Sequence, residues 1–227
     1  MLPQQVLITR PEPGATALAR AIGGGIVSPL MEIVARPVAL PGGAEPIFTS
    51  ANGVRAVGSG RGRAWCVGDR TAEAARAAGF DAVSAGGDAE ALVACVLAAA
   101  RGAALVHVRG AHARGDVAAR LTAAGLTCAE TVAYDQPERP LTAEAEAALA
   151  GDVPLVVPLY SPRGARLLSR HAGNIRAPLD ILALSAAVAE AAAPLGRAET
   201  APRPDGAAML SMIGARLRQA GPGLDRG

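Results

Sequence analysis

The chain contains no lysine, and all 22 of its basic residues are arginine. Without lysine, no Schiff base can form with a carbonyl substrate or with pyridoxal phosphate, so enzymes of those classes are excluded. A Walker A loop is excluded for the same reason, because its lysine is needed at the β- and γ-phosphates. The abundance of Ala, Gly, Arg and Pro is typical of a genome rich in G and C.

Aromatic residues are scarce, with two Tyr, two Phe and one Trp, so a core must be built from Ala, Val, Leu and Ile. A formal net charge of +2 without a basic run or a set of stacking aromatics argues against a nucleic-acid binder. The longest apolar stretches are interrupted by Arg, Asp or Gly well short of a membrane span. We expect neither nucleic acid nor a membrane as a partner.

Cysteines are few: Cys66, Cys95 and Cys128 are odd in number and far apart. This spacing favours reduced thiols over a disulfide framework. No charged region followed by an apolar stretch precedes residues 6–8, so we expect no signal peptide. We therefore expect a cytoplasmic protein, and a monomer. His107 and His112 have no third ligand nearby in the sequence, so we predict no metal site.

Short apolar runs alternate with Ala-rich helical segments along the chain, which indicates βαβ units and parallel sheets. The expected strands are 6–9, 26–28, 47–49, 65–67, 81–84, 104–108, 127–133, 155–159, 181–184 and 197–200. The expected helices are 13–22, 52–58, 70–78, 88–100, 113–124, 142–150, 163–171, 186–195 and 205–219.

A weak internal repeat relates three pairs of segments in the same order. Residues 6–10 resemble 105–109, residues 47–53 resemble 158–164, and residues 67–75 resemble 184–192. Ala-rich sequence makes any single match poor evidence. Three matches in order favour two related α/β sheets.

Two segments, 33–38 and 130–135, do not fit a βα unit, because each is followed by a polar stretch that contains proline. Both are typical of extended strands, and we expect them to lie outside the sheets and to tie two domains together.

The turns that follow strands are the candidate ligand site, because ligands of open α/β sheets collect at the carboxyl ends of strands. Helix N-termini present free N–H groups there, and arginine suits carboxylates or phosphates. The turns are 9–11, 49–52, 68–70, 109–111, 160–163 and 185–186. For any single turn, helix capping is the favoured explanation. The whole set favours an anionic ligand.

Other features carry less weight. Residues 58–62 resemble a glycine-rich phosphate loop but follow a short helix, so we interpret them as an ordinary loop. Ser161 does not lie in the G-x-S-x-G elbow of hydrolases. Tyr134 is either a structural residue or, facing a cleft between domains, a proton donor. Composition does not decide between these two roles.

At the strand-end turns, the sequence resembles the uroporphyrinogen-III synthase family along nearly its whole length. The matching segments are 6–11, 47–54, 66–72, 134–135 and 160–163. The resemblance implies an α/β fold of two flavodoxin- or Rossmann-like parallel-sheet domains joined by a two-stranded β-ladder. Residues 1–30 and 139–227 would form one domain, 42–129 the other, and 31–41 with 130–138 the linker strands.

The resemblance also implies an activity. The family's substrate is hydroxymethylbilane, a linear tetrapyrrole with eight carboxylates, which loses hydroxide and closes through a spiro intermediate with ring D inverted. The product is uroporphyrinogen III, in tetrapyrrole and heme biosynthesis, and no cofactor is used. Tyr134 matches the tyrosine proposed to assist departure of the hydroxyl group. The substrate-binding residues would be Arg10, Ser50, Ala51, Asn52, Gly68, Arg109, Gly110, Ser161, Pro162, Arg163, Ser185 and Ala186.

The chain departs from the family pattern at two places. It reads Ser185-Ala186-Ala187-Val188 where the family often has Gly-Pro followed by Thr or Ser, so hydroxyl contacts are lost there. Pro158 is unusual inside a central strand and predicts a bulge or an edge strand. Two other functions remain open: a non-enzymatic two-domain binder of a small anion, and a transferase or isomerase of phosphorylated sugars. The second would need a phosphate loop or a His or Glu base.

Overall fold

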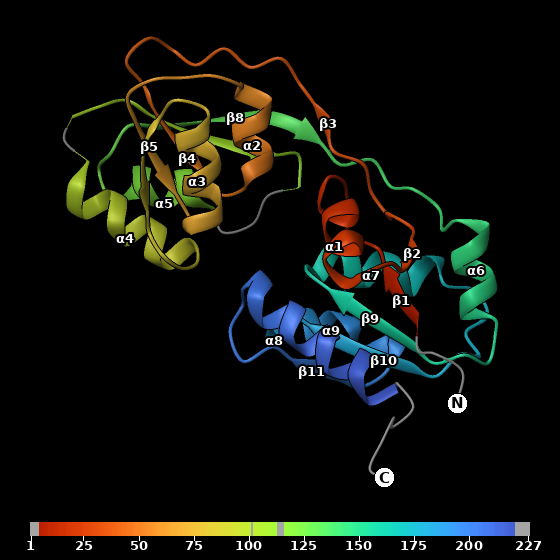
Figure 1. Cartoon of the computed structure of the whole chain (residues 1–227). Coiled ribbons are helices and arrows are strands. Elements are labelled where there is room, and N and C mark those ends of the chain that lie inside the picture. Colours follow the sequence, from red (N-terminus) through yellow and green to blue (C-terminus); the bar gives the residue numbers. More distant parts are fainter. Residues whose placement is uncertain (1–4, 101, 113–115, 221–227) are drawn as a thin grey trace. The chain divides into compact units, whose positions relative to one another are not determined.

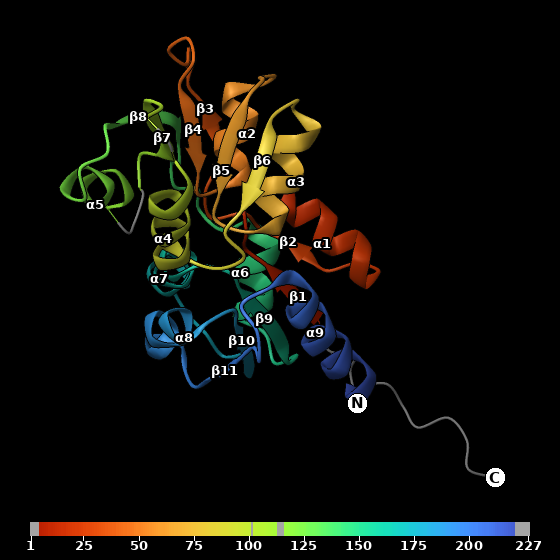
Figure 2. The same cartoon turned by 90° about the vertical axis from the view of Figure 1, so that its left-hand side faces the viewer.

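The computed structural model describes residues 5–100, 102–112 and 116–220. The chain divides into two compact units, which we call unit 1 (Met1–Glu32 and Glu138–Gly227) and unit 2 (Ile33–Pro137). Each unit is an α/β sandwich built on one sheet (Figures 1 and 2). The predicted α/β fold with parallel sheets is confirmed.

The unit 1 sheet is entirely parallel, with strand order β11-β10-β9-β1-β2. Its strands are β1 (Gln5–Ile8), β2 (Ile26–Val27), β9 (Leu155–Leu159), β10 (Leu179–Ala183) and β11 (Ala198–Thr200). The order is that of a doubly wound, flavodoxin-like sheet, whose direction of winding reverses between β1 and β9.

Helices cover both faces of this sheet. On one face α1 (Gly14–Ile22) and α9 (Gly206–Ala220) pack on Val6, Ile8 and Leu182. On the other face lie α6 (Ala143–Leu149), α7 (Pro162–His171) and α8 (Ala186–Ala192), and a 3-10 turn (Ala193–Leu195) follows α8. Because both faces are covered, β9 is buried along its whole length and reads as a continuous apolar run.

The unit 2 sheet has the order β3-β8-β7-β4-β5-β6. Its strands are β3 (Val34–Ala35), β4 (Glu45–Phe48), β5 (Arg63–Cys66), β6 (Asp81–Ser84), β7 (Leu105–Gly110) and β8 (Cys128–Asp135). All pairs are parallel except β3 with β8. Here the winding reverses between β4 and β7.

Its two faces are also covered by helices. The helices α2 (Ala51–Val57) and α3 (Asp69–Ala77) lie over a core that contains Phe48, Val106 and Val108. The helices α4 (Ala89–Ala99) and α5 (Val117–Ala123) lie over Ile47, Trp65 and Leu105. The helix predicted over 113–124 corresponds to α5, and its first residues, 113–115, lie outside the described residues.

The internal repeat is confirmed by the strand pairing. It equates β1 with β7, β9 with β4 and β10 with β5, and these strands occupy the same places in the two sheets. The registers also agree: Val6 pairs with Val156 as Leu105 pairs with Glu45. The repeat therefore assigns each strand-end residue of one unit a counterpart in the other.

The two segments expected to lie outside the sheets pair with each other, but only in part as predicted. The strands β3 and β8 lie side by side (Figure 1), with Val34 and Ala35 paired antiparallel to Asp135 and Tyr134. An isolated bridge joins Met31 to Glu138. However, β8 also pairs parallel with β7 from Cys128 onward. The expectation that 130–135 lies outside the sheets is wrong, because the unpaired edge of β7 takes this segment as a full strand.

Pro158 lies inside a central strand without a bulge, opposite Leu182 of β10, so both expectations for it are wrong. The Leu155 N–H donates towards β10, and alternation along the strand turns the nitrogen of Pro158 towards β1. The pairing of β1 with β9 covers only Gln5 and Val6 of β1, opposite Leu155 and Val156. The ladder thus ends before Pro158, which has no N–H to donate towards β1.

Candidate functional site

The predicted site residues gather at the carboxyl ends of the strands, and most of them lie where the winding of each sheet reverses. In unit 2 these positions follow β4 or end β7, and in unit 1 they follow β1 and β9. Open α/β sheets bind ligands at this reversal, because neighbouring loops leave in opposite directions and open a crevice between them. The two sets are described separately, each within its own unit.

In unit 2, β4 is followed by Thr49 and then by Ser50, the N-cap of α2. The Asn52 backbone N–H donates to Ser50 Oγ (3.2 Å), and Asn52 Oδ1 accepts from Arg55 (2.6 Å). Gly53 lets the helix start close to β7, since a Cβ there would lie 3.0 Å from the Val108 carbonyl oxygen. Ser50, Ala51 and Asn52 thus form one tight strand-to-helix turn.

Tyr134 is brought to the same turn by an irregularity in β8. The pairing of β7 with β8 shifts register between Arg109 and Gly110, so Tyr134 lies opposite Gly110. Ala133 and Tyr134 consequently both contribute to the core on the α2 and α3 side. A Cβ on Gly110 would lie 2.5 Å from Cε2 and 3.0 Å from Oη of Tyr134, so only glycine leaves room for the phenol.

The Tyr134 phenol is 7% exposed and stays protonated at neutral pH. Burial raises its pKa above the ordinary value of a tyrosine, and hydrogen bonds with the Ser50 hydroxyl and the Gly110 backbone offset part of that rise. The expectation that Tyr134 belongs to a linker outside the sheets is wrong. It is a sheet residue whose hydroxyl meets two other predicted site residues, Ser50 and Gly110.

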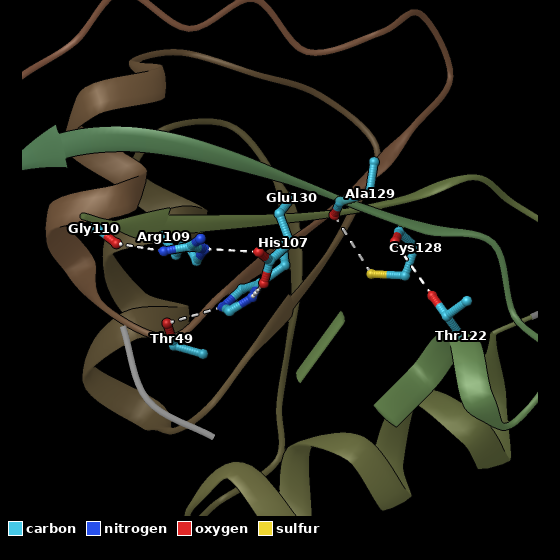
Figure 3. A network of polar contacts seen from close by, with 8 residues as sticks. All are labelled: Thr49, His107, Arg109, Gly110, Thr122, Cys128, Ala129 and Glu130. Carbon is cyan, nitrogen blue, oxygen red and sulfur yellow. Dashed lines mark hydrogen bonds and ion pairs between the residues drawn. The ribbon is translucent and has the colours of Figure 1, made fainter. Parts of the chain in front are cut away.

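Arg109, at the end of β7, is held by two contacts. Its Nε donates to Glu130 Oε2 (3.0 Å) and its Nη1 donates to the Gly110 carbonyl oxygen (3.2 Å) (Figure 3). The other carboxylate oxygen of Glu130 lies 3.3 Å from Nδ1 of His107, and His107 Nε2 lies 3.3 Å from the Thr49 hydroxyl. A polar chain therefore runs from Arg109 to Thr49 across the face of the sheet.

In unit 1, Arg10 follows β1 and lies over the ring of Tyr160, which follows β9. The guanidinium carbon is 4.0 Å from the ring centroid, a cation–π contact. Gly14 permits this position, because a Cβ there would lie 2.6 Å from Arg10 Nε. By the repeat, Arg10 and Tyr160 are the counterparts of Arg109 and Thr49.

The turn after β9 begins α7. Ser161 is its N-cap and accepts from the Gly164 N–H (3.0 Å), and Pro162 occupies the first turn, where its missing N–H costs nothing. Arg163 lies 3.7 Å from Glu138, which also accepts from Arg170 (2.7 Å). These arginines hold the pKa of the Glu138 carboxyl below its ordinary value, chiefly through the hydrogen bond from Arg170.

Gly68 and Ser185 stand at equivalent turns one strand away from the reversal in their sheets. Gly68 is the N-cap of α3, and Ser185 is the N-cap of α8 without a capping bond from its side chain. Ala186 begins α8 at the surface, whereas Val188 is 1% exposed and packs in the core. The valine that departs from the family pattern is thus a core residue.

Sequence reasoning placed Thr49 and Tyr160 in candidate turns without naming them as substrate-binding residues, and it gave Glu130 no role in the site. The repeat carried a signal for the first two, because it equates their positions, but nothing in the sequence joins Glu130 to Arg109. Within the described ranges, His, Cys, Asp and Glu nowhere cluster in a group of three or more that could hold a metal. No helix in the same ranges has the length and apolar character to span a bilayer.

Comparisons with known proteins agree with this architecture. The family model for "Uroporphyrinogen-III synthase HemD" matches residues 15–211. The uroporphyrinogen-III synthetase of Helicobacter pylori is 14% identical, with a TM-score of 0.67 over 95% of this chain and 100% of that one. A mutant uroporphyrinogen III synthase of Thermus thermophilus is 14% identical, with a TM-score of 0.56 over 96% and 100%.

Among curated protein sequences, none matches the chain. At 14% identity, the two solved structures establish likeness of fold alone. The family model spans most of the chain, including both strand-reversal turns of unit 2. The chain therefore belongs to the uroporphyrinogen-III synthase family.

Proposed function

We propose that this family member, a lyase of tetrapyrrole biosynthesis, binds hydroxymethylbilane and closes it to uroporphyrinogen III with inversion of ring D. The single observation that carries the proposal is the placement of an arginine and a helix N-cap at the winding reversal of each sheet. These are Arg10 with Ser161 in unit 1, and Arg109 with Ser50 in unit 2. Such groups suit a substrate with many carboxylates.

Tyr134 is the proposed acid for departure of the substrate hydroxyl. Its raised pKa keeps the proton on the phenol at neutral pH, so it can donate that proton as the C–O bond breaks and water leaves. The hydrogen bonds with the Ser50 hydroxyl and the Gly110 backbone would then stabilise the phenolate. The proton returns to the phenolate after the final ring closure releases a proton from carbon.

The remaining proposed substrate contacts come from backbone and small side chains. Ala51, Asn52, Gly68, Pro162, Arg163, Ser185 and Ala186 lie in strand-to-helix turns. Small residues allow a ligand to approach the backbone closely. In this account the enzyme acts chiefly by holding the chain in the conformation that leads to inversion.

The overall conversion is a loss of water and a rearrangement, without net oxidation or reduction. Proton transfer and positioning suffice for it, and we propose that no cofactor takes part. The three cysteines are free, which agrees with a reducing cytoplasm, and we propose that the enzyme acts there as a monomer. Size-exclusion chromatography with light scattering tests the monomer.

The alternative of a non-enzymatic anion binder gains no support, because the matched family is one of enzymes. The test is to incubate purified protein with freshly made hydroxymethylbilane, oxidise the products and separate the isomers. We expect predominantly the type III isomer. Type I alone, as in a control without protein, would contradict the proposed function.

A further inference from the structure

His107 is a buried polar residue that the proposed mechanism does not use. It lies in β7 at 1% exposure, with its ring between the Thr49 hydroxyl and the Glu130 carboxylate (Figure 3). Thr49 follows β4 directly, so this contact ends at the winding reversal of unit 2. A buried imidazole bonded at both nitrogens has one defined orientation.

The fold itself does not require a histidine at this position. The repeat places Ile8 of unit 1 where unit 2 has His107, and Ile8 is fully buried in an equivalent parallel strand. Ile8 pairs with Val27 just as His107 pairs with Glu130. Apolar residues therefore fill the same two places in the other sheet, and the polar pair serves something other than packing.

The surroundings decide which ring nitrogen carries the proton. Burial lowers the pKa of His107, against the opposing effect of Glu130, so the ring is neutral at about pH 7. The Glu130 carboxylate can only accept, which places the proton on Nδ1. Nε2 is then an acceptor, and the Thr49 hydroxyl must donate its only proton to it.

This arrangement gives Thr49 a defined polarity. With its proton directed at His107, the oxygen of Thr49 can only accept hydrogen bonds from other groups. The neighbouring charged group is of the opposite kind, because Arg109 is a cation. One carboxylate oxygen of Glu130 binds His107, which in turn orients the Thr49 hydroxyl as an acceptor. The other oxygen binds the Arg109 cation directly.

We infer that Thr49 is a further substrate-binding residue, which accepts a hydrogen bond from a pyrrole N–H of the linear tetrapyrrole. His107 and Glu130 are positioning residues for that contact. The inference rests on the proposed function and deepens it. Each pyrrole ring carries an N–H donor and peripheral carboxylates, so its recognition needs an acceptor beside a cationic group.

The first experiment compares Thr49→Val and Thr49→Ser with a matched control. Thr122→Val also removes a threonine hydroxyl from unit 2, but that hydroxyl donates to the Cys128 carbonyl oxygen (3.4 Å) and does not touch His107. We expect Thr49→Val to raise KM about tenfold, as for one lost hydrogen bond, with kcat changed less. Thr49→Ser keeps the hydroxyl and should raise KM less than Thr49→Val does, whereas Thr122→Val should retain the KM of the unmodified enzyme.

A double-mutant cycle tests the positioning role of His107. Asn at this position keeps a donor for Glu130 but removes the acceptor for Thr49. We expect His107→Asn to raise KM as Thr49→Val does, and to add little when both are combined. Thermal unfolding confirms that each variant is folded. If the double variant is folded and its increase in KM equals the product of the two single increases, the coupling between His107 and Thr49 is contradicted.

The second experiment needs no substrate and reads the proton directly. The chain has three histidines, so nitrogen-15 NMR of labelled protein resolves the ring nitrogens of His107 by comparison with His107→Asn. We expect the proton on Nδ1. A proton on Nε2, or an unchanged KM in Thr49→Val of an active enzyme, would overturn the inference and leave the proposed function intact. Absence of type III product from the unmodified enzyme would instead overturn the proposed function and, with it, this inference.

Discussion

Gly110 lies directly against the ring of Tyr134, and no Cβ fits between them: one built on Gly110 would be 2.5 Å from Cε2 and 2.7 Å from Cζ. The contact exists because the register shift in β8 sets the two residues opposite each other. Close approach of a glycine backbone thus fixes the place of the phenol beside Ser50.

The substitution Gly110→Ala should therefore displace Tyr134 and lower kcat by about tenfold or more, because the acid would no longer be held in position. Gly42→Ala is the matched control in unit 2, since a Cβ there meets nothing within 4 Å. Steady-state kinetics checks the prediction, with circular dichroism to confirm folding. Equal kinetics for the two variants would show that the position of Tyr134 is unimportant.

Tyr134→Phe removes the proposed acid while keeping the ring. We expect kcat to fall by roughly a hundredfold, a typical contribution of general acid catalysis, with little change in product affinity. Turnover and product binding are measured on the same preparations. A loss of equal size in both would assign Tyr134 a structural role only.

His107 makes the stability of the enzyme depend on pH. Its pKa is lowered in the folded state, so below the ordinary value of 6.5 the unfolded chain binds more protons than the folded one. The contribution of His107 is complete above that value and is lost as the pH falls through it towards the folded pKa. The groups that face the ring are Glu130 and Arg109.

Urea unfolding between about pH 7.5 and about pH 5 measures this loss. In His107→Ile, which copies the residue that unit 1 has at this place, the decline over that range should be smaller. Parallel curves for the two proteins would contradict the assignment of a buried neutral imidazole.

The cysteines should differ in reactivity. Burial raises the pKa of the Cys66 thiol to about 11, so little thiolate is present at about pH 8, and the residue is fully covered. We expect Cys66 to be alkylated last in the folded protein, after the partly exposed Cys95. Peptide mapping after timed alkylation tests this, with urea-unfolded protein as the control. Early modification of Cys66 would contradict its burial.

The pattern of apolar runs and Ala-rich segments predicted the strands and helices well. The strands are apolar because both faces of each sheet are covered, and the helices alternate with them along the chain. The segment 130–135 was misplaced, since only Ala133 and Tyr134 of β8 are buried and its Pro-containing continuation resembles a free linker. Its pairing with β7 depends on tertiary contacts, which the local sequence pattern does not encode.

The sequence predicted which turns make up the candidate site. Strand ends point to the sheet edge by topology alone, and so Ser50, Arg109 and Gly110 could be named from the sequence. Their mutual contacts could not, because the register shift that sets Tyr134 against Gly110 belongs to the pairing of two strands. Likewise, Glu130 reaches His107 only because β7 and β8 pair in this register.

The central claim is that the strand ends at both winding reversals hold the carboxylates of the substrate. The most direct test is the dissociation constant of uroporphyrinogen III for Arg10→Gln, Arg109→Gln and the double variant, beside Arg203→Gln, an exposed arginine paired with Asp205. We predict about tenfold weaker binding for each single variant, a larger loss for the double variant, and no change for Arg203→Gln. Binding by the double variant as tight as by the unmodified enzyme would contradict the claim.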